Sequence, residues 1–131
     1  MVTARIGRDK YKTEIISGNH HLLSDETVED AGQDLGPEPP EFLKIALASC
    51  TAITLRMYAD RKNWALEKVK VEVESIKTEW KTIFKRTVHL EGNLSEEERQ
   101  RLLEIANACP VHKTLTNPIE VDTKLSTMTE V

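Results

Sequence analysis

Two cysteines, Cys50 and Cys109, are the side chains in this sequence best suited to chemistry. Cys109 directly precedes Pro110, a residue suited to the first turn of a helix, so we expect Cys109 at an N-cap. Backbone amides and the positive end of the helix dipole would then stabilise its thiolate, and a protonated His112 one turn on could help. The alternative for Cys109 is a packed residue at a helix boundary.

Cys50 lies inside the unbroken apolar run ALASCTAITLRM, with no helix end nearby. Burial raises the pKa of a thiol, so a reactive Cys50 would need a cation that the fold brings to it. Without that cation, Cys50 is a small hydrophobic core residue.

Metal binding is a second use for these residues. Cys109 and His112 form a C-x-x-H pair, Cys50 would be a third ligand, and His20 or His21 a fourth. Structural zinc sites usually contain two tight ligand pairs, and adjacent residues on a strand point to opposite faces. We therefore predict no metal and no cofactor.

The composition bounds the class of protein. The 131 residues are 39% hydrophobic, which fits a single domain over residues 1–131. The net charge of -4 is scattered, which argues against nucleic acid as a partner. The charged N-terminus does not resemble a secretory signal, and we expect no membrane span. We therefore expect a cytoplasmic protein. In that reducing compartment we expect no structural disulfide between the two cysteines. Nucleotide-binding and hydrolase motifs are absent from the sequence.

The elements that must position the cysteines follow from local patterns. Residues 2–25 predict two or three antiparallel strands with a turn at Gly18, and the acidic, proline-rich residues 26–41 predict a loop. A helix should begin at Pro39 and run to about residue 60. Because its apolar residues fall on every face, it should be covered by sheet, by other helices or by a second subunit.

The second half of the chain predicts a hairpin followed by helices. Residues 69–80 and 83–92 alternate apolar and charged side chains, as strands with one wet face do, and Trp64 and Trp80 should anchor the core. Ser95 and Glu98 match a capping box, which starts a helix up to residue 108. A short helix should follow Cys109, and a last strand should occupy residues 118–127.

Two motifs together resemble the OsmC/Ohr family of osmotically induced and organic hydroperoxide resistance proteins. They are GPEPPEFLKIALASCTAITLRMYADRKNW, residues 36–64, and ACPVHKTL, residues 108–115. The resemblance implies an α+β fold and an intertwined homodimer with a buried central helix packed against antiparallel sheets. It also implies that Cys50 attacks the peroxide and that Cys109 resolves the product.

The resemblance implies a substrate, a reductant and further site residues. The substrate would be an organic hydroperoxide of fatty-acid type, held by apolar residues of the central helix that we take to be Leu47, Ile53 and Met57. The reductant would be a dithiol, either a lipoylated or a thioredoxin-like protein. A ligand-binding or redox-sensing protein without efficient peroxidase activity is the alternative function.

In the characterised peroxidases of this family a glutamate lies ten residues before the nucleophile and orients an arginine that stabilises the thiolate. Pro40 occupies that position here, so we assign the role to Glu41. The arginine could be Arg5, Arg8 or Arg56, and we assign it to Arg5.

Overall fold

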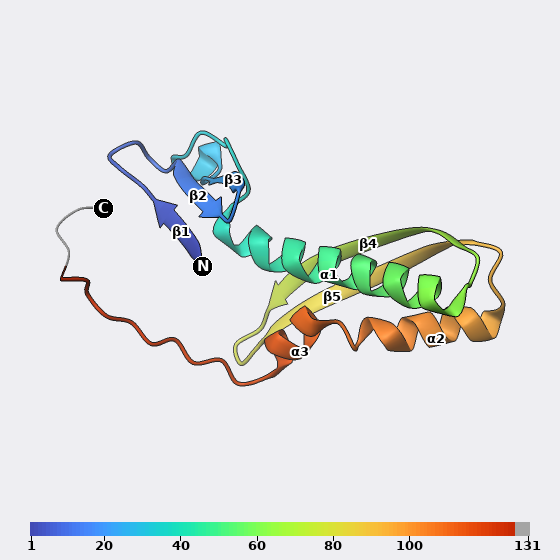
Figure 1. Ribbon diagram of the computed structural model, residues 1–131. Helices are drawn as coiled ribbons and strands as arrows, with labels where there is room; N and C mark the ends of the chain where they lie inside the picture. Colours follow the sequence, from blue (N-terminus) through green and yellow to red (C-terminus); the bar gives the residue numbers. More distant parts are fainter. Residues whose placement is uncertain (128–131) are drawn as a thin grey trace. The chain divides into compact units, whose positions relative to one another are not determined.

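The computed structural model describes residues 1–127 and divides the chain into two compact units (Figure 1). The first unit comprises residues 1–43 together with the C-terminal segment from Asp122, and the second runs from Lys44 to Val121. The prediction of a single domain over residues 1–131 stays a prediction. Each unit is described by itself below.

The first unit contains a three-stranded antiparallel sheet in the order β1-β2-β3. β1 spans Val2–Arg5, β2 spans Thr13–Ser17 and β3 spans His20–Ser24. Gly18 adopts a positive φ of 59° in the β2–β3 turn, a conformation that glycine reaches without steric cost. The predicted antiparallel strands and the turn at Gly18 are thereby confirmed.

The loop after β3 is organised around the buried carboxylate of Asp25, and it contains the short 3-10 helix η1, Val28–Asp30. Four backbone N–H groups donate to this carboxylate, from Tyr11, Glu26, Gln33 and Leu35. Burial acts to raise the pKa of Asp25, but the four donors outweigh burial and the pKa is lowered. The acidic loop predicted from its prolines and glycines therefore has a defined internal anchor.

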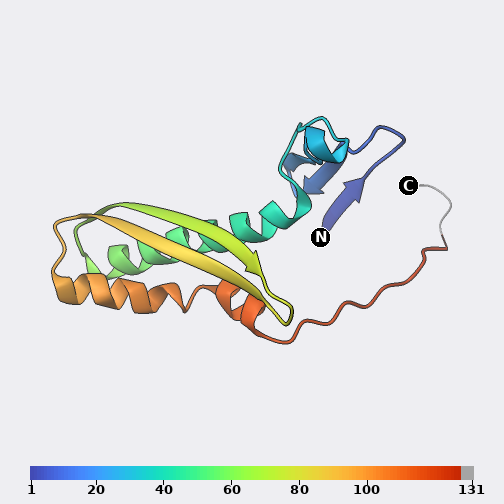
Figure 2. The same cartoon turned by 180° about the vertical axis from the view of Figure 1, so that it is seen from behind.

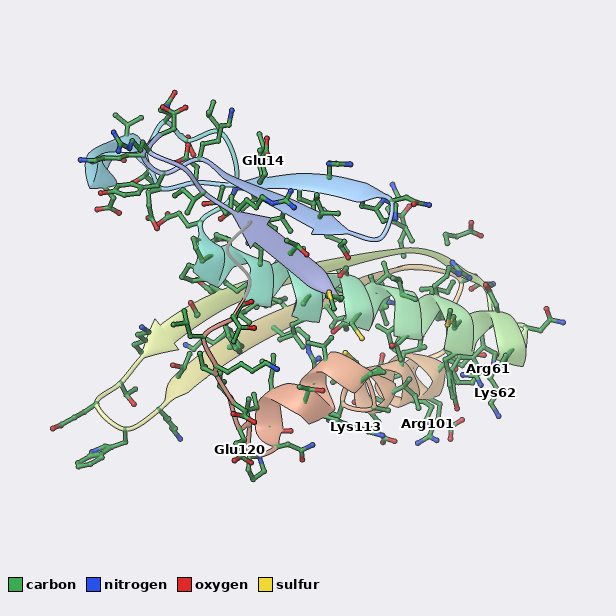
Figure 3. All side chains as sticks on the ribbon, turned by 60° about the vertical axis from the view of Figure 1, so that its left-hand side comes forward. Glu14, Arg61, Lys62, Arg101, Lys113 and Glu120 are labelled. Carbon is green, nitrogen blue, oxygen red and sulfur yellow. The ribbon has the colours of Figure 1, made fainter. Side chains whose placement is uncertain are left out.

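The long helix α1 spans Pro39–Lys62, so its predicted start at Pro39 is confirmed. The next residue, Asn63, has a φ of 61°, in the left-handed region that commonly follows the end of a helix. By length and composition alone α1 is apolar enough to cross a membrane, and the expectation of no membrane span stays a prediction. A core helix of a water-soluble protein passes the same test. Arg61 and Lys62 project from its C-terminal end (Figure 3), where cations complement the helix dipole.

The second unit packs helices against a two-stranded hairpin (Figures 1 and 2). β4 spans Leu66–Lys77 and β5 spans Thr82–Gly92. α2 spans Glu96–Ala106 and begins at the predicted capping box, and α3 spans Pro110–Thr116. One buried cluster joins α1, β4 and α2, namely Leu55, Ala59, Leu66, Leu102 and Ala106.

Two expectations about the hairpin and the C-terminus are wrong. Trp64 packs edge-on against Tyr58, but Trp80 is 88% exposed. Trp80 lies in the turn, which Thr78 closes by accepting hydrogen bonds from the N–H groups of Trp80 and Lys81. Residues 118–127 form no strand, because a strand needs a neighbouring edge to pair with and none pairs with them within the described residues.

Candidate active site

The second unit brings the two cysteines together. Cys50 comes from the middle of α1 and is half-buried, whereas Cys109 precedes α3 and is fully buried. Both are free thiols, and they lie close enough for each to shift the pKa of the other. The site is therefore a pair of interacting thiols rather than two separate ones.

Cys109 is the N-cap of α3, as the sequence predicts. Its sulfur accepts a hydrogen bond from the backbone N–H of His112, at 3.5 Å, and Pro110 occupies the first turn. A sulfur that accepts hydrogen bonds carries negative charge more readily than a sulfur whose thiol proton is donated in a hydrogen bond.

The environments of the two thiols push their pKa values apart. Burial, followed by the hydrogen bond with Cys109, raises the pKa of Cys50. Burial also acts to raise the pKa of Cys109, but the hydrogen bonds from Cys50 and from the His112 N–H outweigh it, and the pKa is lowered. Because the groups interact, they titrate as a pair, and the first proton lost leaves the negative charge mainly on Cys109.

Arg86 of β5 is the cation of this site. Its Nη1 donates to Thr51 Oγ1 at 3.0 Å, and its Nη2 donates to Asn107 Oδ1 at 3.0 Å and to His112 Nδ1 at 3.1 Å. These partners belong to α1, to the C-cap of α2 and to α3, so Arg86 ties all three helices to the hairpin.

A guanidinium has no acceptor, so Nδ1 of His112 must accept and its proton must lie on Nε2. Burial, and then the positive charge of Arg86, lower the pKa of His112. His112 is therefore neutral at physiological pH and does not act as the protonated helper considered from the sequence.

A pocket of about 620 Å³ opens beside Arg86. Its polar end contains Arg86, Asn107 and His112, and most of its remaining wall is apolar. The other lining residues are Leu47, Thr82, Phe84, Val88, Leu103, Leu115 and Thr116. Below, this space is called the Arg86 pocket; it has the size and the mixed lining of a small-molecule site.

Comparison with known families matches most of the chain to one family. The model of the family described as OsmC-like protein matches residues 32–124, which include both cysteines and Arg86. The chain belongs to the OsmC-like protein family. Comparison with curated proteins found no match.

Solved structures of OsmC-like proteins share the fold. An OsmC-like protein from Mycoplasma pneumoniae is 20% identical, with a TM-score of 0.76 over 88% of this chain and 85% of that one. The organic hydroperoxide resistance protein OhrB of Bacillus subtilis is 25% identical, with a TM-score of 0.63 over 88% and 89%. An organic hydroperoxide resistance protein OsmC from Legionella pneumophila is 24% identical, with a TM-score of 0.61 over 88% of each chain.

The other site residues that the family resemblance suggested do not all lie at the cysteine pair. Leu47 is buried and lines the Arg86 pocket. Ile53 and Met57 are more than half exposed, at 54% and 59%, and line a separate shallow depression between α1 and β4. Arg56 donates to Asp60 and to the carbonyl of Leu66, so its guanidinium is engaged there.

Arg5, Arg8 and Glu41 belong to the first unit. Arg5 and Arg8 line a depression between β1 and β2. The roles of Arg5 and Glu41 at Cys50 stay predictions, as do those of Ile53 and Met57.

The sequence does contain a signal for Arg86. In the alternating run of β5 the partly covered positions are Phe84, Arg86, Val88 and Leu90, while the residues between them are exposed. Arg86 is thus a charged residue on the apolar face of a strand, where a lone cation is unfavourable unless it has partners.

Proposed function

We propose that this OsmC-like protein is a thiol-dependent peroxidase that reduces organic hydroperoxides through Cys50 and Cys109. The observation that carries the proposal is the pair of interacting free thiols, together with the cation Arg86 that acts on both of them. Five of the ten residues that line the Arg86 pocket are apolar, which suits the alkyl group of an organic hydroperoxide; neither cysteine is among these lining residues.

The reaction uses only the electrons of the two thiols. The thiolate of Cys50 attacks the terminal peroxide oxygen, the O–O bond breaks, and the departing alkoxide takes up a proton to become an alcohol. Cys50 is then a sulfenic acid, which condenses with the thiol of Cys109 to give a disulfide and water. A dithiol reductant, lipoylated or thioredoxin-like, restores both thiols by exchange.

The assignment of the nucleophile to Cys50 is supported by its exposure. Cys109 carries the charge more readily, but it is fully buried, whereas Cys50 is half-buried and is the more exposed of the two residues. The hydrogen bond between the sulfurs lets the proton pass from Cys50 to Cys109, so that the accessible sulfur becomes the thiolate as it attacks.

We further propose a homodimer in the cytoplasm. Within the second unit, the buried residues of α1 lie on one face, and Ile45, Ile53 and Met57 are exposed on the opposite face. Exposed apolar side chains on one helix face are unfavourable in water, and a second copy of α1 would cover them.

A hydrophobic ligand-binding role is the alternative, and the volume of the Arg86 pocket supports it. In that case the cysteines would be packed or would sense oxidation. A ligand that copurifies with the protein, together with slow thiol oxidation, would favour this role.

The test is a stopped-flow titration of the reduced protein with one equivalent of cumene hydroperoxide, followed by thiol counting and disulfide mapping. We expect rapid loss of both thiols in the wild type, a trapped sulfenic acid in Cys109→Ser and no reaction in Cys50→Ser. A wild type that keeps both thiols, while a known peroxidase consumes the peroxide in the same buffer, would rule out the peroxidase.

A further inference from the structure

We propose that the Arg86 pocket binds a small organic carboxylate, with the anionic group at Arg86 and the hydrocarbon part against the apolar wall. The site does not depend on peroxidase activity, because neither cysteine is among the residues that line the pocket. All of these lining residues belong to the second unit. The ligand is then an amphipathic anion rather than a neutral hydrophobic molecule.

The polar end of the pocket carries a positive charge. Arg86 is half-buried, and burial lowers its pKa, but a guanidinium keeps its charge at neutral pH. The guanidinium donates hydrogen bonds to Thr51, Asn107 and His112, which are all neutral. No carboxylate of residues 1–127 forms an ion pair with it. A carboxylate in the pocket would therefore meet a cation that no acidic side chain already pairs with.

Arg86 also fixes which polar atoms its two neighbours in the pocket present. Because a guanidinium has no acceptor, Oδ1 of Asn107 and Nδ1 of His112 must both accept from it. The remaining polar atoms of these side chains, Nδ2 of Asn107 and Nε2 of His112, are therefore N–H donors. Within the part of the chain that the structure describes, neither donates to a protein group. The polar end thus offers hydrogen-bond donors from three side chains, which suits an anion.

The rest of the wall is mainly apolar. Phe84 and Val88 lie two residues before and after Arg86, on the same face of β5. The three helices each add one leucine, namely Leu47 of α1, Leu103 of α2 and Leu115 of α3. Among the described lining residues none is acidic, so a bound carboxylate meets no like charge there.

The two ends of the pocket together select an amphipathic anion. A neutral hydrophobic ligand would remove water from the guanidinium without supplying a counter-charge, which is unfavourable. Acetate or inorganic phosphate would supply the charge but would leave the apolar wall in contact with water. A carboxylate with an aliphatic chain satisfies both ends. The volume of about 620 Å³ lies in the range of small-molecule sites, roughly 300–1,000 Å³.

Isothermal titration calorimetry of the reduced protein at pH 7 tests the site with octanoate, octanamide and acetate. Octanamide has the same chain with a neutral head group, and acetate has the head group without the chain. We expect octanoate to bind roughly tenfold or more tightly than octanamide, because hydrogen bonds to charged groups are the stronger ones, and acetate to give no heat of binding. Equal affinity for octanoate and octanamide, or no binding of octanoate below its micelle concentration, would overturn the proposal.

Arg86→Gln and Lys85→Gln form a matched pair, since they remove the same charge from adjacent residues of β5. Arg86 lines the pocket, whereas Lys85 is exposed on the opposite face of the strand. We expect Arg86→Gln to weaken octanoate binding roughly tenfold or more and to change octanamide binding much less. Lys85→Gln should bind both probes as the wild type does. An equal loss of octanoate binding in both variants would reflect net charge alone and would overturn the proposal.

Leu103→Glu tests the wall while Arg86 stays in place, so the test remains decisive if Arg86→Gln does not fold. Leu103 lines the pocket and is 53% exposed, so a charged side chain can be accommodated there. The introduced carboxylate should repel octanoate and weaken its binding. Gln100→Glu adds the same charge at an exposed position of α2 outside the lining and should leave the binding unchanged.

Octanoate binding that is unaffected by Leu103→Glu would place the ligand elsewhere and overturn the proposal. Because none of the three probes contains a peroxide bond, these results stand apart from the stopped-flow test of the proposed function.

Discussion

Replacing Thr51 by valine tests whether Arg86 is held as the structure indicates. Thr51 is fully buried, donates its hydroxyl proton to the carbonyl of Leu47 at 2.7 Å and accepts from Arg86 Nη1 at 3.0 Å. Valine has nearly the same shape, so the change leaves no cavity. It leaves one donor of the half-buried guanidinium without its acceptor.

The expected cost follows from two opposing effects. A hydrogen bond to a charged group contributes about 1.5–3 kcal/mol, and the half-buried position of Arg86 favours the lower part of that range. The added methyl group gains about 0.8 kcal/mol from apolar burial. The free energy of unfolding should therefore fall by about 1–2 kcal/mol, relative to the wild type.

Urea unfolding of the reduced protein at pH 7, at one fixed protein concentration, measures this difference. With a typical slope of about 1–3 kcal/mol per molar urea, the midpoint should fall by about 0.5–1 M. Thr87→Val, at an exposed position of the same strand, is the control and should stay within about 0.5 kcal/mol of the wild type. A Thr51→Val protein as stable as the wild type would refute the hydrogen-bonded anchoring of Arg86.

Four further predictions follow from burial, charge and the proposed dimer. Leu55→Ala, in the fully buried cluster, should lower stability by about 2–5 kcal/mol in the same urea assay. Ile53→Glu, on the exposed face of α1, should turn a dimer into a monomer in analytical ultracentrifugation, and a wild type that is already monomeric would contradict the dimer. The pKa of His112 is lowered in the folded protein, so below about pH 6.5 the unfolded state binds more protons than the folded state. The free energy of unfolding should therefore fall as the pH drops through that value, and His112→Gln should flatten this part of the pH profile of stability. The pKa of Asp25 is also lowered, so its contribution is present above its unfolded pKa of about 3.9 and is lost as the pH falls below it; Asp25→Asn should lower the melting temperature at pH 7 and reduce its acid dependence.

The elements that the sequence predicted correctly depend on neighbouring residues. Pro39 starts α1, Ser95 with Glu98 starts α2, and Cys109 with Pro110 starts α3. Each signal lies within one helical turn of the feature it produces, so no knowledge of the fold is needed to interpret it. The same locality explains why the N-cap position of the candidate thiol could be inferred before its partner was known.

The wrong expectations depend on pairing between distant segments. Trp80 was expected in the core because it follows an alternating run, but the side-chain hydrogen bonds of Thr78 place it in the turn. Residues 118–127 alternate like a strand, yet a strand forms only where an edge is available to pair with it. An alternating pattern specifies which face would be buried, not which segment covers it.

Arg86 could not be assigned to the site from local sequence signals. It lies 36 residues after Cys50 and 23 before Cys109, so spacing along the chain gives no reason to associate the three. The arginines expected to activate Cys50 lie near the N-terminus and on the central helix, whereas Arg86 lies on the covered face of a strand.

Its position on the covered face distinguishes Arg86 from its neighbours in β5. Lys85 and His89 occupy exposed positions of β5, where charge costs little, whereas Arg86 occupies a position between Phe84 and Val88 on the covered face. Placing a guanidinium there is unfavourable unless donors and charge are both satisfied. Thr51, Asn107 and His112 satisfy the donors, and the charge faces the Arg86 pocket. A guanidinium is thus tolerated at this covered position because three helices that lie far from it in the sequence supply its hydrogen-bond acceptors.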